Sequence, residues 1–382
     1  MGMEENTETV LSHAQIKLAH SRAALVSDRD QAMKNHPSVS EVKKEVLAKR
    51  ADSKKRIDKV VEFFFLFIAL ICASVIVFIT VFIIYKGLLP FIGKSGVYDP
   101  IDFGYFWTGS HWQSDPTHWA VGYLAVNTLF LTLLSLVVSI PVSILTALMI
   151  TRIAPRALSK IFQTGIELLA AIPSVIFGLF GMGFINPMVK GLADLFDLQT
   201  AGGNSLLSGV FVIALMSVPT ITMMSTTAMK AVDPALIKAS VALGATKLQT
   251  DFKVVVRTAQ SGIFAGIILG IGRALGEATA IQMVIGNAMS GPSFNPFGIS
   301  ATLTTQMLMG IGEATPGTIG YDIRFSAGAL LIIILFVVDI FLNSLKDQMY
   351  DRMVGRTHVS WFKKFFNKLF PPEKRSLKKE KE

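Results

Sequence analysis

Two ionisable residues, Arg273 and Glu277, lie in an apolar segment, Ser261 to Asn287, that is long enough to cross a bilayer. A transmembrane helix needs roughly 20 residues, and a charged residue at its centre is unfavourable by about 2.5–3.5 kcal/mol. Arginine binds two oxygens of an oxyanion with its planar fork and stays charged at physiological pH. One interpretation is a guanidinium on a transport path for an anion, held by Glu277 until substrate arrives. The other is an intramembrane salt bridge that fixes the register of the helix.

Small residues precede this charged pair at helical spacing. The series is Gly262, Gly266 and Gly270, followed by Arg273, Glu277 and Ala280. On a helix, residues at steps of three and four share one face, and small residues there let a second helix approach closely. We therefore expect the three glycines to form a helix-packing seam, with the charged pair facing protein or water rather than lipid.

The composition excludes a soluble protein of two or three domains. Hydrophobic residues make up 51% of the 382 residues, charged residues 16%, and the mean hydropathy is +0.53. These values indicate a membrane protein with several spans. The net charge of +9 does not indicate a nucleic-acid partner, because the basic residues gather beside apolar runs. The single cysteine, Cys72, excludes an intrachain disulfide.

Six apolar segments predict six transmembrane helices and an all-α membrane protein. The segments are 60–88, 125–151, 166–189, 206–230, 260–286 and 325–346. The loops 152–165 and 230–259 are basic, whereas each of the other three loops holds a single Lys or Arg. The positive-inside rule therefore places the basic loops and both termini in the cytoplasm.

These segments divide the chain into three parts. We expect a cytoplasmic, partly helical or disordered N-terminal tail at 1–59, a transmembrane domain at 60–346 and a basic cytoplasmic tail at 347–382. Membrane lipid is the first partner that this organisation implies.

The first outer loop is rich in aromatic residues. They are Tyr105, Phe106, Trp107, Trp112 and Trp119. Aromatic rings at the headgroup level anchor a protein at the interface, which is the expected role; a surface for an external partner is the alternative. The last outer loop is expected to hold a short helix between Ser300 and Ile311. Three spans contain a proline, at Pro141, Pro173 and Pro219, where kinks are expected.

The loop 230–259 carries signals for a short helix over 234–243. Asp233 is a suitable N-cap, Pro234 suits the first helical position, and Gly244 lies where a left-handed glycine ends a helix. This helix is either a simple connector or the element that a cytoplasmic motor grips. The chain has no G-x-x-x-x-G-K-[ST] loop for nucleotide phosphates, so a partner must supply any ATP hydrolysis.

The same loop resembles the EAA coupling loop of ABC-importer permeases, through Lys238-Ala239-Ser240 and then Gly244. Lys238 stands in place of the family's glutamate and Ser240 in place of its second alanine. GIELLAAIPSVIFGLFGM (165–182), GRALGEATAIQMVIGN (272–287) and FWTGSHW (106–112) resemble the PstC-like phosphate permeases. The resemblance covers about residues 60–346 and implies the type I ABC importer permease fold.

The resemblance implies a membrane-spanning subunit of an ATP-driven phosphate importer in the bacterial cell membrane. Arg273 and Glu277 would line the substrate path. The residues expected to couple to the ATPase are Asp233, Pro234, Lys238, Ala239, Ser240 and Gly244. The chain itself would be no enzyme, with no catalytic residues, metal site or cofactor, since ATP and Mg would be used by the partner ATPase.

The implied partners are a PstA-like second permease, a cytoplasmic dimer of ATPase subunits and an external phosphate-binding protein. Two alternatives remain open. One is a permease for another oxyanion, sulfate or molybdate, because physical arguments do not separate tetrahedral anions of similar size. The other is an ATP-independent secondary transporter, which inverted repeats or a chain of intramembrane acids would support.

Overall fold

The computed structural model describes residues 21–29, 39–115 and 117–354, without the side chains of 39–57, 114–115 and 350–354. Much of the predicted N-terminal tail, and the tail 347–382 beyond residue 354, therefore lies outside the described residues. Residues 21–29 are helical. The chain divides into two units, 1–78 and 79–382, and α2 (Val39–Ile92) runs from the first into the second.

The first apolar segment lies within α2. Its part from Asp58 to Ile92 contains a window of 18 residues with a mean hydropathy of 3.1. Large apolar residues such as Phe63 and Phe78 occur throughout this part. A helix that is apolar all round is typical of a membrane span.

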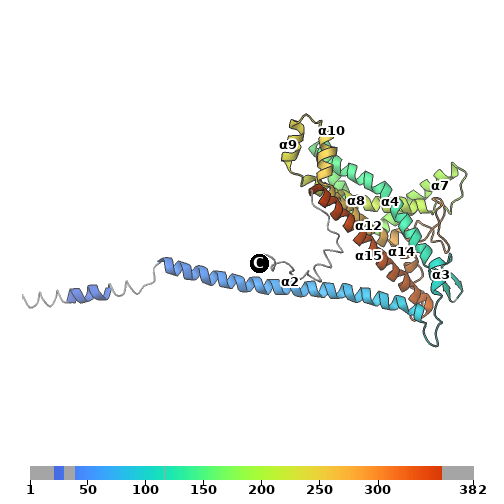
Figure 1. The fold of residues 1–382 in the computed structure, drawn as a ribbon, viewed down its shortest axis with the longest axis horizontal. Coiled ribbons are helices and arrows are strands. Elements are labelled where there is room, and N and C mark those ends of the chain that lie inside the picture. Colours follow the sequence, from blue (N-terminus) through green and yellow to red (C-terminus); the bar gives the residue numbers. More distant parts are fainter. Residues whose placement is uncertain (1–20, 30–38, 116, 355–382) are drawn as a thin grey trace, which may run out of the picture. The chain divides into compact units, whose positions relative to one another are not determined.

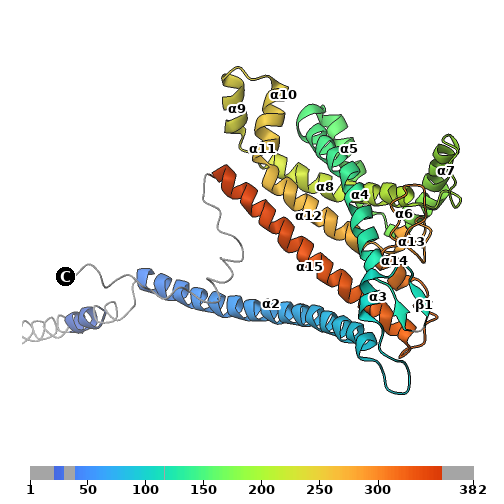
Figure 2. The ribbon, with the colours of Figure 1, turned by 45° about the vertical axis from the view of Figure 1, so that its right-hand side comes forward.

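The second unit is almost entirely helical (Figures 1 and 2). After α2 its helices are α3 (Phe103–Thr108), α4 (Gly122–Leu148), α5 (Arg156–Ala171), α6 (Ser174–Phe180), α7 (Asn186–Asp194), α8 (Leu206–Lys230), α9 (Pro234–Ala242), α10 (Lys247–Thr250), α11 (Val256–Thr258), α12 (Gln260–Gly276), α13 (Thr279–Gln282), α14 (Leu303–Leu308) and α15 (Ile319–Val354). Three π-helical turns, η1 (Met149–Ile153), η2 (Gly181–Ile185) and η3 (Asp251–Val255), interrupt this series. A two-stranded antiparallel sheet, β1 (Gln113–Asp115) and β2 (His118–Trp119), lies in the loop between α2 and α4. The short helix expected between Ser300 and Ile311 is α14.

Within the described residues, five helices are long and apolar enough to cross a membrane. They cover Asp58–Ile92, Gly122–Ile153, Ser174–Asp194, Leu206–Lys230 and Ile319–Met349. A sixth span is obtained if Lys247–Thr258 and Gln260–Gly276, which meet at a bend of 66°, are counted together. The prediction of an all-α membrane protein is confirmed. The predicted segment 206–230 has the observed bounds, and the other five differ from them, most of all the third and the fifth.

The predicted third span, 166–189, is wrong in its first part. The helix α5 ends at Ala171, and a new helix begins at Ser174 after a break at Ile172 and Pro173. Proline lacks a backbone N–H and disfavours the α conformation of the residue before it, and Ile172 is accordingly extended. Pro141 and Pro219, by contrast, lie inside the continuous helices α4 and α8.

Helices α4 and α8 pack along a buried seam of small hydroxyl residues. Ser135, Ser139 and Ser143 of α4 and Ser217 and Ser225 of α8 are all buried. The Ser143 hydroxyl lies 2.6 Å from the Ser139 carbonyl oxygen of its own helix, to which it donates a hydrogen bond. Small residues allow close approach of helix backbones in a membrane, where water supplies no driving force for association.

The expectation that the aromatic residues of the outer loop anchor it at the lipid interface is wrong for three of them. Phe106, Trp112 and Trp119 are only 3–5% exposed and belong to a core cluster with residues of α4, α14 and α15. The two indoles meet edge to face, with ring centroids 5.5 Å apart. The loop therefore folds inward as part of the protein core, while Trp107 remains exposed.

Candidate functional site

The glycine series of the fifth apolar segment faces α8. An added Cβ would lie 2.4 Å from Ala228 Cβ at Gly262, and 2.7 Å from Met224 Cβ at Gly266. At Gly270 it would lie 2.8 Å from Ile221. Each distance is shorter than real Cβ contacts allow, so larger residues would force α8 and α12 apart. The lack of side chains at these three glycines thus allows the close approach of the two helices, and Arg273 follows them along α12.

Arg273 and Glu277 do not form the charge pair that one helix would give. The helix α12 ends at Gly276, and Glu277 is extended, so Glu277 leaves the stripe. The Arg273 Nη1 atom donates to the Thr220 hydroxyl on α8 at 3.3 Å. No ion pair joins Arg273 to Glu277 among the residues described, and the predicted helix 260–286 is wrong beyond Gly276.

The Glu277 carboxylate accepts hydrogen bonds from the residues that follow it. Its Oε1 atom accepts a hydrogen bond from the Ala280 N–H at 3.1 Å and another from the Thr279 hydroxyl at 3.0 Å. These bonds satisfy donors at the start of α13, as a capping side chain does at a helix N-terminus. The carboxylate therefore stabilises the break between α12 and α13 and does not hold the guanidinium.

Side chains from α14 and α6 form hydrogen bonds at the break between α12 and α13. The Thr304 hydroxyl of α14 donates to the Glu277 carbonyl oxygen at 2.7 Å. The Ser174 hydroxyl at the start of α6 lies 2.9 Å from that of Thr279. Non-helical backbone is tolerated at membrane depth only where protein or water satisfies its polar groups. These hydroxyls do so, and they make the junction a fixed element beside Arg273.

Sequence reasoning missed the residues that satisfy the junction. Thr220, Ser174 and Thr304 are separated from Arg273 and Glu277 by tens of residues, and their spacing predicts no contact. One signal was available: each is a hydroxyl residue inside or beside an apolar run, where such side chains bond across helices.

The surface beside Arg273 is open. Gly276 is exposed, and an added Cβ there would have no neighbour within 4 Å. Arg273 is itself partly buried, between this open face and the contact with α8. A guanidinium has five N–H donors, and one of them is used by Thr220, so the geometry allows Arg273 to bind an oxyanion from the open side.

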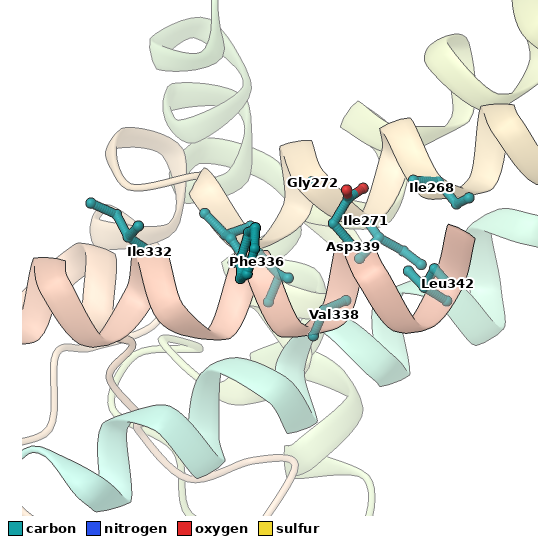
Figure 3. A pocket seen from close by; sticks show the side chains of 10 residues that line it. Ile268, Ile271, Gly272, Ile332, Phe336, Val338, Asp339 and Leu342 are labelled. Carbon is teal, nitrogen blue, oxygen red and sulfur yellow. The ribbon is translucent and has the colours of Figure 1, made fainter. Parts of the chain in front are cut away.

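A groove of about 390 Å³ lies between α12 and α15, with Gly272 in its lining (Figure 3). Apolar residues line it, together with Asp339 of α15, whose carboxylate is on the side of α15 that faces α12. No cationic side chain lines this groove. Its chemistry does not suit an anion.

The short helix predicted over 234–243 is present as α9. The Asp233 side chain accepts from the Ala235 N–H at 2.8 Å, Pro234 is the first helical residue, and Gly244 has φ +85°. Lys238 and Ala239 are exposed, whereas the Ser240 hydroxyl lies 2.9 Å from that of Thr250. In both views α9 and α10 lie together beyond the ends of α8 and α12 (Figures 1 and 2).

The helix α9 is followed along the chain by α10, η3 and α11, and these lead into α12, which carries Arg273. The segment Lys247–Thr258 meets Gln260–Gly276 at a bend of 66°.

Comparisons with known proteins agree with this arrangement. Residues 139–354 match the family model described as "Binding-protein-dependent transport system inner membrane component". The chain is 36% identical over 284 residues to the probable ABC transporter permease protein YqgH of Bacillus subtilis, covering 73% of this chain and 88% of the relative. It is 33% identical over 228 residues to the phosphate transport system permease protein PstC of Xylella fastidiosa strain Temecula1, covering 56% of this chain and 68% of that relative.

A solved structure shows the same fold. A chain of a bacterial ABC transporter involved in the import of the acidic polysaccharide alginate aligns with a TM-score of 0.50 and 19% identity. The alignment covers 77% of this chain and 99% of that one. Together with the family match over more than half of the sequence, this shows the type I importer permease fold. The chain belongs to the binding-protein-dependent transport system inner membrane components, the multi-pass cell-membrane permease subunits of ABC importers.

Proposed function

We propose that this permease subunit carries inorganic phosphate into the cell, and that Arg273 binds the anion on its path. The observation that carries the proposal is that Arg273 lies in a membrane-spanning region beside an open face, with Thr220 as its hydrogen-bond partner. The identity of about 30% to permeases named for phosphate transport supports the choice of substrate.

The physical argument starts from the cost of moving an anion through a low-dielectric path. Phosphate crosses as a mono- or dianion, and desolvation opposes its passage unless a positive group compensates. Glu277 caps α13 and leaves the guanidinium charge uncompensated by a carboxylate contact. The planar fork of arginine can then bind two phosphate oxygens at once.

The complete importer would contain three kinds of partner. A PstA-like permease would face the open side of α12, and an external phosphate-binding protein would deliver the substrate. A dimer of ATPase subunits, using ATP and Mg, would contact the exposed face of α9 that carries Lys238 and Ala239. This assignment puts the termini and the loop 230–259 in the cytoplasm, in agreement with the charge of the loops.

The test is uptake of radiolabelled phosphate by proteoliposomes that contain the complete importer, with sulfate measured in parallel. Arg273→Gln removes the charge, and loss of a hydrogen bond to a charged group, about 1.5–3 kcal/mol, corresponds to roughly a tenfold to hundredfold fall in uptake. Arg273→Lys keeps the charge without the fork, so an intermediate rate is expected. Arg156→Gln is the matched control, because Arg156 is exposed and outside the candidate path.

Assembly of each variant is checked by co-purification of the subunits, so that loss of the complex is not mistaken for loss of transport. Uptake at the wild-type rate by an assembled Arg273→Gln importer would show that Arg273 has only a packing role. Uptake of sulfate in place of phosphate would refute phosphate as the substrate, while the proposed role of Arg273 in anion binding would stand.

A further inference from the structure

An ion pair with a buried carboxylate joins the turn after α4 to the segment that follows α9. The Arg152 Nε atom donates to Asp251 Oδ1 at 2.8 Å, although the two residues are 99 positions apart. The Asp251 side chain is 1% exposed and that of Arg152 is 25% exposed. A buried carboxylate is strongly unfavourable without its partner, so the pair holds these two segments together.

The ion pair is only half engaged. The second carboxylate oxygen, Oδ2, is buried and has no hydrogen-bond partner in the described structure. Arginine and a carboxylate commonly bind through two parallel hydrogen bonds. The unpartnered Oδ2 atom leaves room for a second, parallel hydrogen bond between the same two side chains.

Both residues lie in π-helical turns. Arg152 belongs to η1 at the end of α4, and Asp251 is the first residue of η3. Such turns interrupt the regular bonding of an α-helix and occur frequently at functional sites. Here they lie on the two sides of one ion pair, where a change in local register would alter the engagement of the pair.

The segment that carries Asp251 is also attached to α9. The Ser240 hydroxyl of α9 lies 2.9 Å from that of Thr250, the residue before Asp251. Ile237 of α9 packs against a buried cluster that contains Leu148 at the end of α4. The helix α9 is thus in direct contact with the residue next to Asp251.

We propose that the Arg152–Asp251 pair is the positioning link by which a movement of α9 is transmitted to α4. The inference rests on the proposed coupling role of α9 and adds the internal residues through which the coupling acts. With the pair intact, α9, η3 and the end of α4 move as one body. Without it, α9 can move while α4 lags.

The first test measures this movement and does not depend on the substrate. Spin labels are placed at Leu145→Cys on α4 and Val241→Cys on α9, both at exposed positions, in a Cys72→Ser background. Electron–electron distances are recorded in the complete importer without nucleotide and after trapping with ATP and vanadate. We expect the 145–241 distance to stay constant with the pair intact and to shift on trapping in Asp251→Asn.

The second test measures coupling as substrate transported per ATP hydrolysed. Asp251→Asn is expected to lower this ratio at least fivefold, the lower end of typical coupling effects. Arg152→Lys, which keeps the charge without the planar fork, should lie between it and the wild type. Lys253→Gln removes an exposed charge from the same π-helical turn and is expected to leave the ratio unchanged.

The inference is overturned if the labelled distance responds to nucleotide equally with and without the pair. It is also overturned if Asp251→Asn and Arg152→Lys lower complex yield while the transport ratio stays at the wild-type value, since the pair would then only stabilise the fold. If the Asp251→Asn complex does not assemble, both measurements are made on Arg152→Lys, because the Arg152 side chain is partly exposed and its substitution disturbs the fold less. Absence of phosphate uptake by the wild type would refute the proposed substrate and leave the distance test valid.

Discussion

Gly244 at the end of α9 offers a clean perturbation of the proposed coupling helix. Its φ is +85°, in the left-handed region, and an added Cβ would meet nothing within 4 Å. A substitution there changes the backbone energy without a steric clash. For an L-residue the left-handed conformation costs about 1–2 kcal/mol, and the β-branched valine is at the upper end.

A penalty of about 1–2 kcal/mol corresponds to a fivefold to thirtyfold change in the population of the native helix end. We therefore expect Gly244→Val to lower the substrate transported per ATP by up to this factor, with Gly244→Ala intermediate. Gly244→Asn should be nearly neutral, because asparagine tolerates the left-handed region. Hydrogen exchange of the α9 amides, measured on the same complexes, should increase in the same order.

The order of the Gly244 variants in transport ratio tests whether the left-handed backbone of Gly244 matters for coupling. Equal transport ratios for the valine and asparagine variants would show that the conformation of Gly244 is irrelevant to coupling and that the loop is a connector. A fall in ratio without faster hydrogen exchange would place the effect in a direct contact of the side chain with a partner and not in the backbone.

Three further outcomes follow from the packing and topology. Gly266→Val should reduce the yield and thermal stability of the complex by an overpacking penalty of about 1–3 kcal/mol, because its Cβ would lie 2.7 Å from that of the facing methionine of α8; unchanged melting would contradict this. Lys86→Met removes the cation 3.6 Å from the buried Asp322 and should destabilise the complex by about 3–5 kcal/mol. The additional substitution Asp322→Asn should restore part of this stability, and thermal unfolding measures both effects. In a Cys72→Ser chain, a cysteine at the exposed Leu243 should react with impermeant reagents only from the cytoplasm and one at Val97 only from outside; the reverse would exclude contact of α9 with an ATPase.

A hydrogen bond joins Tyr98, in the loop after α2, to Asp322 of α15. The Tyr98 hydroxyl donates to Asp322 Oδ2 at 2.9 Å. Burial, reinforced by this hydrogen bond and by the charge of Asp322, raises the pKa of Tyr98 above its ordinary value. The hydroxyl therefore stays protonated and keeps donating to Asp322 throughout the physiological range, which holds the outer loop on α15.

The break after Gly276 shows the limit of sequence reasoning for the site. The apolar pattern continues through Glu277 to Asn287, so a single helix was the natural prediction. An interruption inside a membrane is stable only if other segments satisfy the freed backbone groups. Those groups are satisfied by Thr304, from a distant helix, and by the Glu277 side chain itself, which no local pattern predicts.

The packing of the tryptophans in the loop before α4 is likewise not predictable from the sequence. A tryptophan has an apolar body and one polar N–H, so it suits a lipid interface and a protein core equally well. Its place depends on whether the outer ends of α4 and α15 leave room for it, which is decided by the assembled helices. Trp112 and Trp119 fill that room, and Trp107, in the same loop, does not.

The sequence by itself determined the features that depend on local chemistry. Apolar runs of membrane length predicted most of the spanning helices, and Asp233, Pro234 and Gly244 predicted both ends of α9, because capping and left-handed turns involve only neighbouring residues. The tertiary structure alone decided which partners the isolated charges take. Arg273 binds Thr220, Glu277 caps α13, and Arg152 meets Asp251 across 99 positions, because a charge inside a membrane protein goes to whichever compensating group the packed helices bring within reach.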